Sequence, residues 1–216
     1  MAERPVFVPL KSGRRLVSEV SIAFRWQPGM APSQKRKNIS ALHQAASDRG
    51  LQYILEISSK SEREIGRRLS AFHQKIEVSG YLVSLESAFQ GSKVFEKGGP
   101  FTDIFHLDPR SAKRDLRLRE SGKLLHFSFE EEIFPLTPPT IFYDWLYINA
   151  IYPERNWLRR LSKIDGFTDI EFNPEKSVNC QARSCALFVS LESRGLLDEA
   201  ITSFESFKDI LTASDL

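Results

Sequence analysis

The 216-residue chain contains few of the residues from which metal and disulfide sites are built. It has two cysteines, Cys180 and Cys185, and four scattered histidines. Two thiols at this spacing form neither a four-ligand metal set nor a C-x-x-C redox pair, and no H-E-x-x-H motif occurs. We therefore expect both cysteines to be small buried apolar side chains, and we expect no metal and no cofactor.

Long hydrophobic runs are also absent from the sequence. The most apolar stretch, Ile141 to Tyr152, contains Asp144 and Asn149 and is too short to cross a bilayer. The first residues lack the basic-then-apolar order of a signal peptide. Hydrophobic residues make up 41% and charged residues 27%, a composition that disfavours the disordered and membrane classes. We expect a cytoplasmic protein with no membrane partner.

Acidic residues are in excess only in the C-terminal tail. The formal net charge is +2, but residues 191–216 carry two basic and six acidic side chains, a net of −4 that leaves +6 on the rest. A moderately basic body is compatible with a polyanionic partner, although it does not establish one.

The N-terminal quarter predicts a strand, a helix and a second strand. Apolar and polar residues alternate over Val20–Trp26, which is the period of a half-buried strand. Helical periodicity follows over Ser33–Arg49, and the short apolar run Leu51–Ile57 predicts another strand. Ser61, with Glu64 three residues later, has the form of a capping box that opens a helix.

A hairpin and a further helix are predicted next. Lys75–Val78 and Tyr81–Val83 flank Ser79-Gly80, a two-residue turn signal, and Ser84 then caps a helix that runs through Phe95. The later elements are a basic helix over Ser111–Arg119, a strand over Leu124–Phe129, a helix over Thr140–Ala150, an extended segment over Phe167–Phe172, and helices from Gln181 that break near Gly195. With no repeat or linker in the sequence, we predict one mixed α+β domain over residues 1–216 that is predominantly helical.

The segment from Ser84 to Lys93 contains the most informative pattern. On a helix, Glu86, Gln90 and Lys93 lie at positions i, i+4 and i+7, so all three project from one face. Helical spacing by itself favours a solvated face with weak Glu/Lys pairing, worth roughly 0.3 kcal/mol per pair. The motifs around this segment decide between a solvated face and a functional site.

Those motifs resemble the NADAR family, the YbiA-like N-glycosidases associated with NAD and ADP-ribose. The family's Glu-x-x-Phe-Gln-x-x-Lys motif is complete as Glu86, Phe89, Gln90 and Lys93. Other motifs also occur in the same order along the chain as in the family. They are Leu69–Phe72, the hairpin Ile76–Tyr81 that follows it, and Phe167–Glu171 followed by Asn179. The resemblance implies a NADAR/YbiA-like fold and cleavage of an N-glycosidic bond.

A narrower resemblance is to the NADAR proteins encoded beside DarT-type toxins, which ADP-ribosylate guanine in DNA. It rests on Gly166–Arg183 and on the aromatic segment Phe142–Tyr147. The general family core covers about residues 68–187, and the strand–helix–strand region before it is an addition that belongs to this branch.

The chain departs from the family pattern at three places. Ala71 stands where many members have asparagine, Phe134 corresponds to a usual tryptophan, and the late Trp-Gly pair is absent after Asp169. The motif on the predicted helix is nevertheless intact. These departures imply the same bond chemistry with altered substrate recognition.

Glu86 and Lys93 are the predicted catalytic residues. Cleavage of a base–ribose bond needs stabilisation of a positively charged anomeric carbon and protonation of the departing base, and Glu86 can serve either need. A lysine amine whose pKa is lowered by burial can attack the anomeric carbon and form a Schiff base, and Lys93 is the candidate for this route. The resemblance implies that both residues matter, and it places Gln90 in the substrate-binding set.

The pyrophosphate of ADP-ribose requires hydrogen-bond donors. Arg67 and Arg68, just ahead of Ser70, are the predicted donors, because an arginine fork matches phosphate geometry. Ser70 is included with them in the predicted substrate-binding set. Both arginines also have a structural alternative, which is pairing with Glu64 on the same helix.

Aromatic and polar side chains complete the predicted substrate-binding set. Phe72, Phe89 and Trp145 offer stacking surfaces for adenine or the modified base, although most of the aromatic residues in such a chain form the core. Asp169 is predicted to anchor ribose hydroxyls. Asn179 either does the same or caps the start of a helix.

The function predicted from these residues is removal of ADP-ribose from modified guanine in DNA, as an antitoxin that pairs with a DarT-type toxin. Basic clusters at Lys35–Lys37 and Lys113–Arg119 either follow the DNA backbone or are ordinary solvated helix faces. Two alternatives stay open. One is a metabolic N-glycosidase that acts on a small phosphorylated riboside, and the other is a non-catalytic module that binds ADP-ribose or the toxin.

Overall fold

The computed structural model describes residues 1–29, 31–175 and 177–215. The chain forms two compact units, one built from Met1–Ser70 with Glu154–Leu216 and the other from Ala71–Pro153. Each unit is described by itself below. Within the described residues, no helix combines the length and the apolar character that are needed to cross a membrane.

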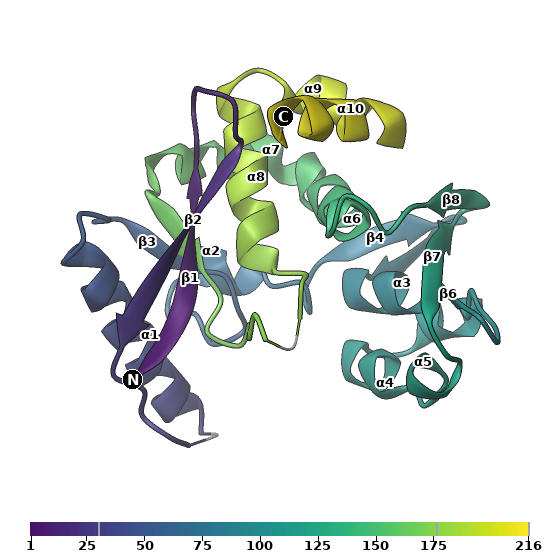
Figure 1. Ribbon diagram of the computed structural model, residues 1–216, viewed down its shortest axis with the longest axis horizontal. Coiled ribbons are helices and arrows are strands. Elements are labelled where there is room, and N and C mark those ends of the chain that lie inside the picture. Colours follow the sequence, from purple (N-terminus) through teal and green to yellow (C-terminus); the bar gives the residue numbers. More distant parts are fainter. Residues whose placement is uncertain (30, 176, 216) are drawn as a thin grey trace. The chain divides into compact units, whose positions relative to one another are not determined.

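The first unit is built on a four-stranded sheet with the order β2-β1-β9-β3 (Figure 1). Strand β1 (Ala2–Pro9) pairs antiparallel with β2 (Val17–Phe24), and β3 (Ile54–Glu56) pairs parallel with β9 (Gly166–Thr168). A single pair, Phe7 with Phe167, joins the two halves through β1 and β9. The sheet therefore brings the N-terminal region beside a segment that lies 160 positions later in the chain.

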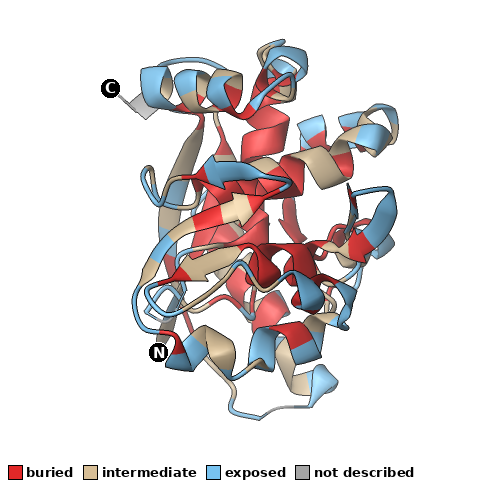
Figure 2. Ribbon diagram, turned by 90° about the vertical axis from the view of Figure 1, so that its right-hand side faces the viewer, coloured by how far each residue is buried: buried red, intermediate tan, exposed pale blue. Residues whose placement is uncertain are grey.

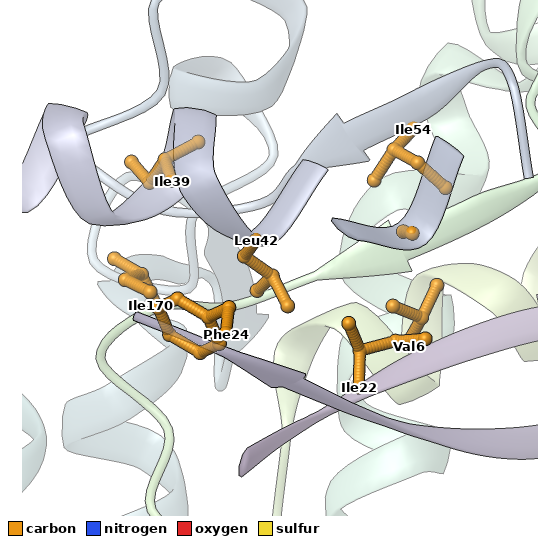
Figure 3. Close-up of a cluster of buried hydrophobic side chains, with 8 residues drawn as sticks. Val6, Ile22, Phe24, Ile39, Leu42, Ile54 and Ile170 are labelled. Carbon is orange, nitrogen blue, oxygen red and sulfur yellow. The ribbon is translucent and has the colours of Figure 1, made fainter. Parts of the chain in front are cut away.

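One hydrophobic core cluster of the first unit lies between this sheet and helix α1 (Pro32–Ser47) (Figure 3). Its buried members are Val6, Ile22, Phe24, Ile39, Leu42, Ala46, Ile54 and Ile170. Ile39, Leu42 and Ala46 are the buried apolar residues that the helix contributes, whereas Ala45 is only partly buried. Burial of branched aliphatic side chains stabilises the fold by about 1.5–3 kcal/mol each.

Helices make up the rest of the first unit. They are α2 (Glu64–Arg68), α7 (Arg155–Leu158), the 3-10 helix η3 (Arg159–Lys163), α8 (Gln181–Ser193), α9 (Leu197–Ala200) and α10 (Phe204–Asp215). Helix α8 packs against β1 and β9 and is buried over most of its length (Figure 1). Helix α10 buries Phe204, Phe207 and Leu211 and exposes its opposite side (Figure 2).

The second unit contains a hairpin, a buried helix and a small sheet. The hairpin consists of β4 (Lys75–Val78) and β5 (Tyr81–Ser84), and it leads into α3 (Leu85–Gly91). The remaining elements are β6 (Lys93–Phe95), the 3-10 helix η1 (Thr102–His106), α4 (Pro109–Arg114), α5 (Arg117–Glu120), β7 (Leu124–Phe129), β8 (Glu132–Phe134) and α6 (Ile141–Ile151). Strands β6, β7 and β8 form an antiparallel sheet in that order, and the 3-10 helix η2 (Tyr152–Glu154) follows α6.

The α+β fold class is confirmed, with 44% of the residues helical and 20% in strands, so helix predominates as predicted. The predicted hairpin around Ser79-Gly80 is also correct, with Val78 paired to Tyr81. A single domain over residues 1–216 stays a prediction.

Several predicted element boundaries are wrong. The capping-box interpretation fails because the residue that precedes α2 is Arg63, which makes no side-chain cap. The extended segment at Phe167 ends at Thr168, after which the chain turns. The basic helix is divided into α4 and α5, because Asp115 leaves the helical conformation and its carboxylate accepts hydrogen bonds from the backbone and side chain of Arg117.

Strand β1 is missing from the sequence prediction. Pro5 and Pro9 lie within it, and proline is normally confined to strand edges and ends because it cannot donate a ladder hydrogen bond. Here β1 pairs with β9 only at Phe7, so neither proline has to donate to that neighbour.

Candidate functional site

Helix α3 carries three of the predicted site residues, Glu86, Phe89 and Gln90, and is buried along its whole length. The Ser84 side chain caps the helix by accepting a hydrogen bond from the backbone N–H of Ser87 at 3.0 Å. At its other end Gly91 is required by close packing, because an added Cβ would lie 2.6 Å from the Phe105 ring. The helix is therefore fixed at both ends, which restricts the positions of the side chains that it carries.

Lys93 does not lie on this helix. The helix ends at Gly91, and Lys93 is the first residue of β6, where it pairs with Phe127 of β7. The predicted helix through Phe95 and the i+7 position of Lys93 are therefore wrong. The lysine still reaches the expected neighbour, because its Nζ donates a hydrogen bond to Oε1 of Gln90 at 2.7 Å.

Gln90 joins Lys93 to Glu86. Its amide Nε2 donates to Oε1 of Glu86 at 2.9 Å, while its Oε1 accepts from Lys93. The orientation of the amide is determined by its neighbours, because an ammonium can only donate and a carboxylate can only accept. Glu86 and Gln90 are each 6% exposed, so the interpretation as a solvated surface face is wrong.

The environment of Lys93 increases the population of its neutral form. Burial lowers the pKa of Lys93 from 10.5 to about 8, with the Glu86 carboxylate opposing this change and the Lys113 ammonium adding to it. The ammonium also lies over the face of the Phe89 ring, 4.9 Å from its centroid. At pH 7 on the order of one tenth of the side chains are then neutral, compared with less than about 0.1% for an ordinary lysine.

We predict that Lys113→Gln raises the pKa of Lys93, because it removes a positive charge that disfavours the protonated amine. NMR titration of the Lys93 side chain is expected to give a value near 8 in the wild type and a higher one in the variant. Lys208→Gln, on helix α10 of the other unit, makes the same charge change as a control. A wild-type pKa near that of free lysine would contradict the described environment.

Phe89 belongs to a cluster of aromatic side chains in the second unit. Its ring centroid lies 5.3 Å from Phe127, 6.2 Å from Phe142 and 5.1 Å from Tyr143, and its side chain is buried. The cluster explains the conspicuous aromatic content of helix α6, and it supports the core alternative for Phe89. The Phe89 ring therefore gives the Lys93 amine an apolar and polarisable surface to lie on.

The other predicted stacking residues of the second unit are more exposed to solvent than Phe89. Trp145 on α6 is partly exposed and packs on Phe134 with a centroid distance of 5.4 Å. Phe72, which follows Ala71 at the start of the unit, is also partly exposed. Phe134, which stands where the family usually has tryptophan, is buried and packs in the core.

The predicted phosphate ligands belong to the first unit, on and after helix α2. Arg67 donates to the backbone oxygens of Ser61 and Glu62 at 2.8 and 2.7 Å. Arg68 forms an ion pair with Glu154 at 2.5 Å and stacks over Trp157 at 4.5 Å.

Ser70 differs from these arginines. It is 1% exposed, and its hydroxyl has no hydrogen-bond partner among the described residues. An unsatisfied buried hydroxyl costs about 1–3 kcal/mol, which a ligand atom can recover.

Asp169 and Asn179 also lie in the first unit. Asp169 follows β9 and keeps partial exposure, with Oδ2 accepting from Gln181 at 2.8 Å and Oδ1 from the Glu171 N–H at 2.9 Å. Burial among protein atoms raises the pKa of Asp169 to about 6. The capping alternative for Asn179 is wrong, because the residue that precedes α8 is Cys180 and it makes no side-chain cap.

Sequence reasoning missed a second polar cluster in the first unit, centred on Glu56 of β3. This carboxylate is 2% exposed and accepts hydrogen bonds from Ser58, Thr168 and the Ile170 N–H. Thr168 in turn contacts Nε2 of His43 at 2.9 Å. A charged residue inside the apolar run Leu51–Ile57 was the signal that could have revealed it.

Burial determines the protonation of this cluster. It raises the pKa of Glu56 to about 8, with a further contribution from the Asp169 charge, and lowers that of His43 to about 4. The predicted burial of Cys180 and Cys185 is confirmed, and burial raises the pKa of both thiols. Among the described residues, no group of three histidine, cysteine or carboxylate side chains is arranged to hold a metal ion.

Comparison with known families gives a match that covers residues 2–216, to the model described as DarT1-associated NADAR antitoxin. A comparison with curated proteins found no match. The family match extends over nearly the whole chain, including the strand–helix–strand region before the general family core. It confirms the resemblance drawn from the Glu86–Lys93 motif and indicates an antitoxin paired with a DarT toxin. The chain belongs to the NADAR family, in its branch of DarT1-associated antitoxins.

Proposed function

We propose that this antitoxin is an N-glycosidase that removes ADP-ribose from modified guanine in DNA and so reverses the damage done by its toxin. The observation that carries the proposal is the buried chain Lys93–Gln90–Glu86, with hydrogen bonds of 2.7 and 2.9 Å. It combines a nucleophile of lowered pKa with a carboxylate held at a fixed distance. A module that only bound ADP-ribose would gain nothing from a partly neutral lysine.

In the proposed reaction, the neutral Lys93 amine attacks the anomeric carbon of the ADP-ribose. The bond from this carbon to the guanine nitrogen breaks, and its electron pair leaves with the base, which takes up a proton. Opening of the ribose ring converts the lysine adduct to an imine and the ring oxygen to a hydroxyl. Water then adds to the imine, which releases ADP-ribose and regenerates the amine.

Glu86 has two possible tasks in this reaction, and both need a carboxyl group beside the ribose. As a carboxylate it stabilises the positive charge that develops at the anomeric carbon, and as an acid it supplies the proton for the departing base. Gln90 bridges the two residues, since it donates to Glu86 and accepts from Lys93. The Glu86 charge raises the pKa of Lys93, but the opposite effect of burial is larger.

The residues of the first unit remain candidates for binding the ADP-ribose moiety. Ser70 has a buried hydroxyl available for a ligand, and Asp169 has a partly exposed carboxylate suited to ribose hydroxyls. Arg67 and Arg68 are proposed to face the pyrophosphate. The partial exposure of Trp145 suits stacking on a base, as it does for Phe72.

The direct test uses a DNA oligonucleotide that carries ADP-ribosyl-guanine. Incubation with the pure protein is expected to restore unmodified DNA and to release free ADP-ribose, both of which are measured by mass spectrometry. Tight binding of the oligonucleotide without release would instead identify a binding module. Release from a small phosphorylated riboside, with modified DNA left intact, would identify a metabolic N-glycosidase.

We predict that DNA binding depends on exposed cations of helix α4, and that it weakens with salt. Lys113 and Arg114 are exposed, whereas Arg117 is held in ion pairs with Asp103 and Asp115. We therefore expect Arg117 to contribute less to DNA binding than Lys113 and Arg114 do. Lys113→Gln and Arg114→Gln are each expected to reduce the slope of log affinity against log salt by about 0.7–0.9.

The control is Arg117→Gln, which removes a charge that is already neutralised and is expected to change the slope less. Binding isotherms at several salt concentrations measure all three variants. An affinity that does not change between low and moderate salt would mean that recognition rests on the ADP-ribose alone.

A further inference from the structure

The Glu56 carboxylate contacts the chain on both sides of Asp169. Its Oε2 accepts from the Thr168 hydroxyl at 2.7 Å, and its Oε1 accepts from the Ile170 N–H at 2.9 Å. These are the two residues adjacent to Asp169 in the sequence. We propose that Glu56 is a positioning residue, which fixes the Asp169 carboxylate for ligand binding by holding both of its neighbours.

The need for such a residue follows from the local fold. Strand β9 ends at Thr168, whose carbonyl oxygen accepts a hydrogen bond from the Ile57 N–H at 2.7 Å, and Asp169 is the first residue beyond it. The carboxylate of Asp169 contacts Gln181 and the Glu171 N–H, which orient the side chain. The next backbone N–H, that of Ile170, is bound by the Glu56 carboxylate. Glu56 ties this strand end to β3, the strand that pairs with it in parallel.

His43 allows the hydrogen-bond chain to persist whether or not Glu56 is ionised. When Glu56 is a carboxylate, His43 Nε2–H donates to the Thr168 oxygen, and the Thr168 hydroxyl donates to Glu56. When Glu56 is protonated, the same chain can run in reverse, from Glu56 through Thr168 to an unprotonated Nε2. A histidine that burial keeps neutral can adopt either tautomer, so both directions are open.

Several charged groups surround this cluster and influence its protonation. Arg63 acts on His43, and the charge of Glu171 raises the pKa of Asp169. Cys180 stays a neutral thiol, because burial and the carboxylates raise its pKa. The pKa of Glu56, about 8, is higher than that of Asp169, about 6. Asp169 is therefore the member of the pair that is ionised at neutral pH.

Two matched variants test the positioning role. Thr168→Val removes the hydroxyl that joins Glu56 to the segment of Asp169, at nearly constant side-chain volume. Ser58→Ala is the control, because Ser58 donates to the same carboxylate at 2.6 Å and does not belong to that segment. We expect hydrogen exchange of the Ile170 amide, measured by NMR, to accelerate about tenfold in Thr168→Val and to change little in Ser58→Ala.

A comparison of the variants' affinities for free ADP-ribose, measured by calorimetry, tests whether the cluster affects ligand binding. This part rests on the proposed contact of Asp169 with the ligand. Thr168→Val is expected to weaken binding about as much as Asp169→Asn, roughly tenfold, while Ser58→Ala stays within about twofold. Thermal unfolding of both variants shows whether their loss of stability is comparable.

The direction of the hydrogen-bond chain has its own measurement. Nitrogen-15 NMR of His43 is expected to show a protonated Nδ1 below the pKa of Glu56 and a protonated Nε2 above it, with no charged imidazolium at either pH. Glu56→Gln is expected to abolish this change.

Equal exchange of the Ile170 amide in Thr168→Val and Ser58→Ala would overturn the positioning role. Faster exchange with unchanged ADP-ribose affinity would overturn its link to the ligand. Failure of the wild type to release ADP-ribose from DNA would count against the proposed function alone, because the exchange measurement needs no substrate.

Discussion

Borohydride added during turnover is expected to leave ADP-ribose attached to Lys93, in an amount that follows the enzyme concentration. The imine proposed for the reaction is reduced to a stable amine before water can hydrolyse it. Intact-mass and peptide mass spectrometry measure the adduct and locate it. Lys93→Ala is expected to abolish both the adduct and turnover, because no other lysine donates to Gln90 among the described hydrogen bonds.

Lys93→Arg separates two roles that alanine cannot distinguish. Arginine retains the positive charge but forms no imine, since its guanidinium stays protonated in proteins. Inactivity of this variant is expected. Lys97→Ala, which removes an exposed lysine of the same unit, serves as the control and is expected to remain active. An active Lys93→Arg variant would mean that the lysine supplies charge only, and the N-glycosidase assignment would then stand without the covalent step.

Glu86→Gln is expected to lower kcat by about 10²–10⁴-fold while the Kd for ADP-ribose changes much less. Glutamine has the shape of glutamate, and its oxygen can still accept the hydrogen bond from Gln90 Nε2. What is lost is the negative charge and the ability to release or take up a proton. Single-turnover kinetics on ADP-ribosylated DNA, together with calorimetry, measure the two effects separately.

The matched control for Glu86 is Glu120→Gln on helix α5, an exposed carboxylate of the same unit. It makes the same chemical change and is expected to leave kcat within about twofold of the wild type. Because Glu86 is buried, thermal unfolding has to establish that the Glu86→Gln variant folds normally. A folded variant with wild-type turnover would show that Glu86 is not catalytic.

Local patterns in the sequence predicted the elements around the site well. The turn at Ser79-Gly80 and the cap at Ser84 are determined by neighbouring residues, so both appear where the sequence indicates. The end of helix α3 was predicted four residues too late, although Gly91 is a residue type at which helices often end. Beyond it, Lys93 pairs with Phe127, a partner 34 positions away that no local pattern indicates.

The polar cluster in the first unit shows the same limit. His43, Glu56 and Thr168 come from α1, β3 and β9, and only the pairing of β3 with β9 brings the last two together. No spacing rule connects residues that are 112 positions apart. The arrangement of Glu86 and Gln90 was predictable by contrast, because one turn of helix separates them.

The position of Lys93 on a strand has a consequence for the thermodynamics of ligand binding. A flexible lysine side chain loses about 1–2 kcal/mol of rotational entropy when it is immobilised. Here the backbone is fixed by pairing with β7, the amine lies over the Phe89 ring, and it is hydrogen-bonded to Gln90. This entropy is therefore lost during folding, and a bound ligand would meet a proposed nucleophile that has already been ordered.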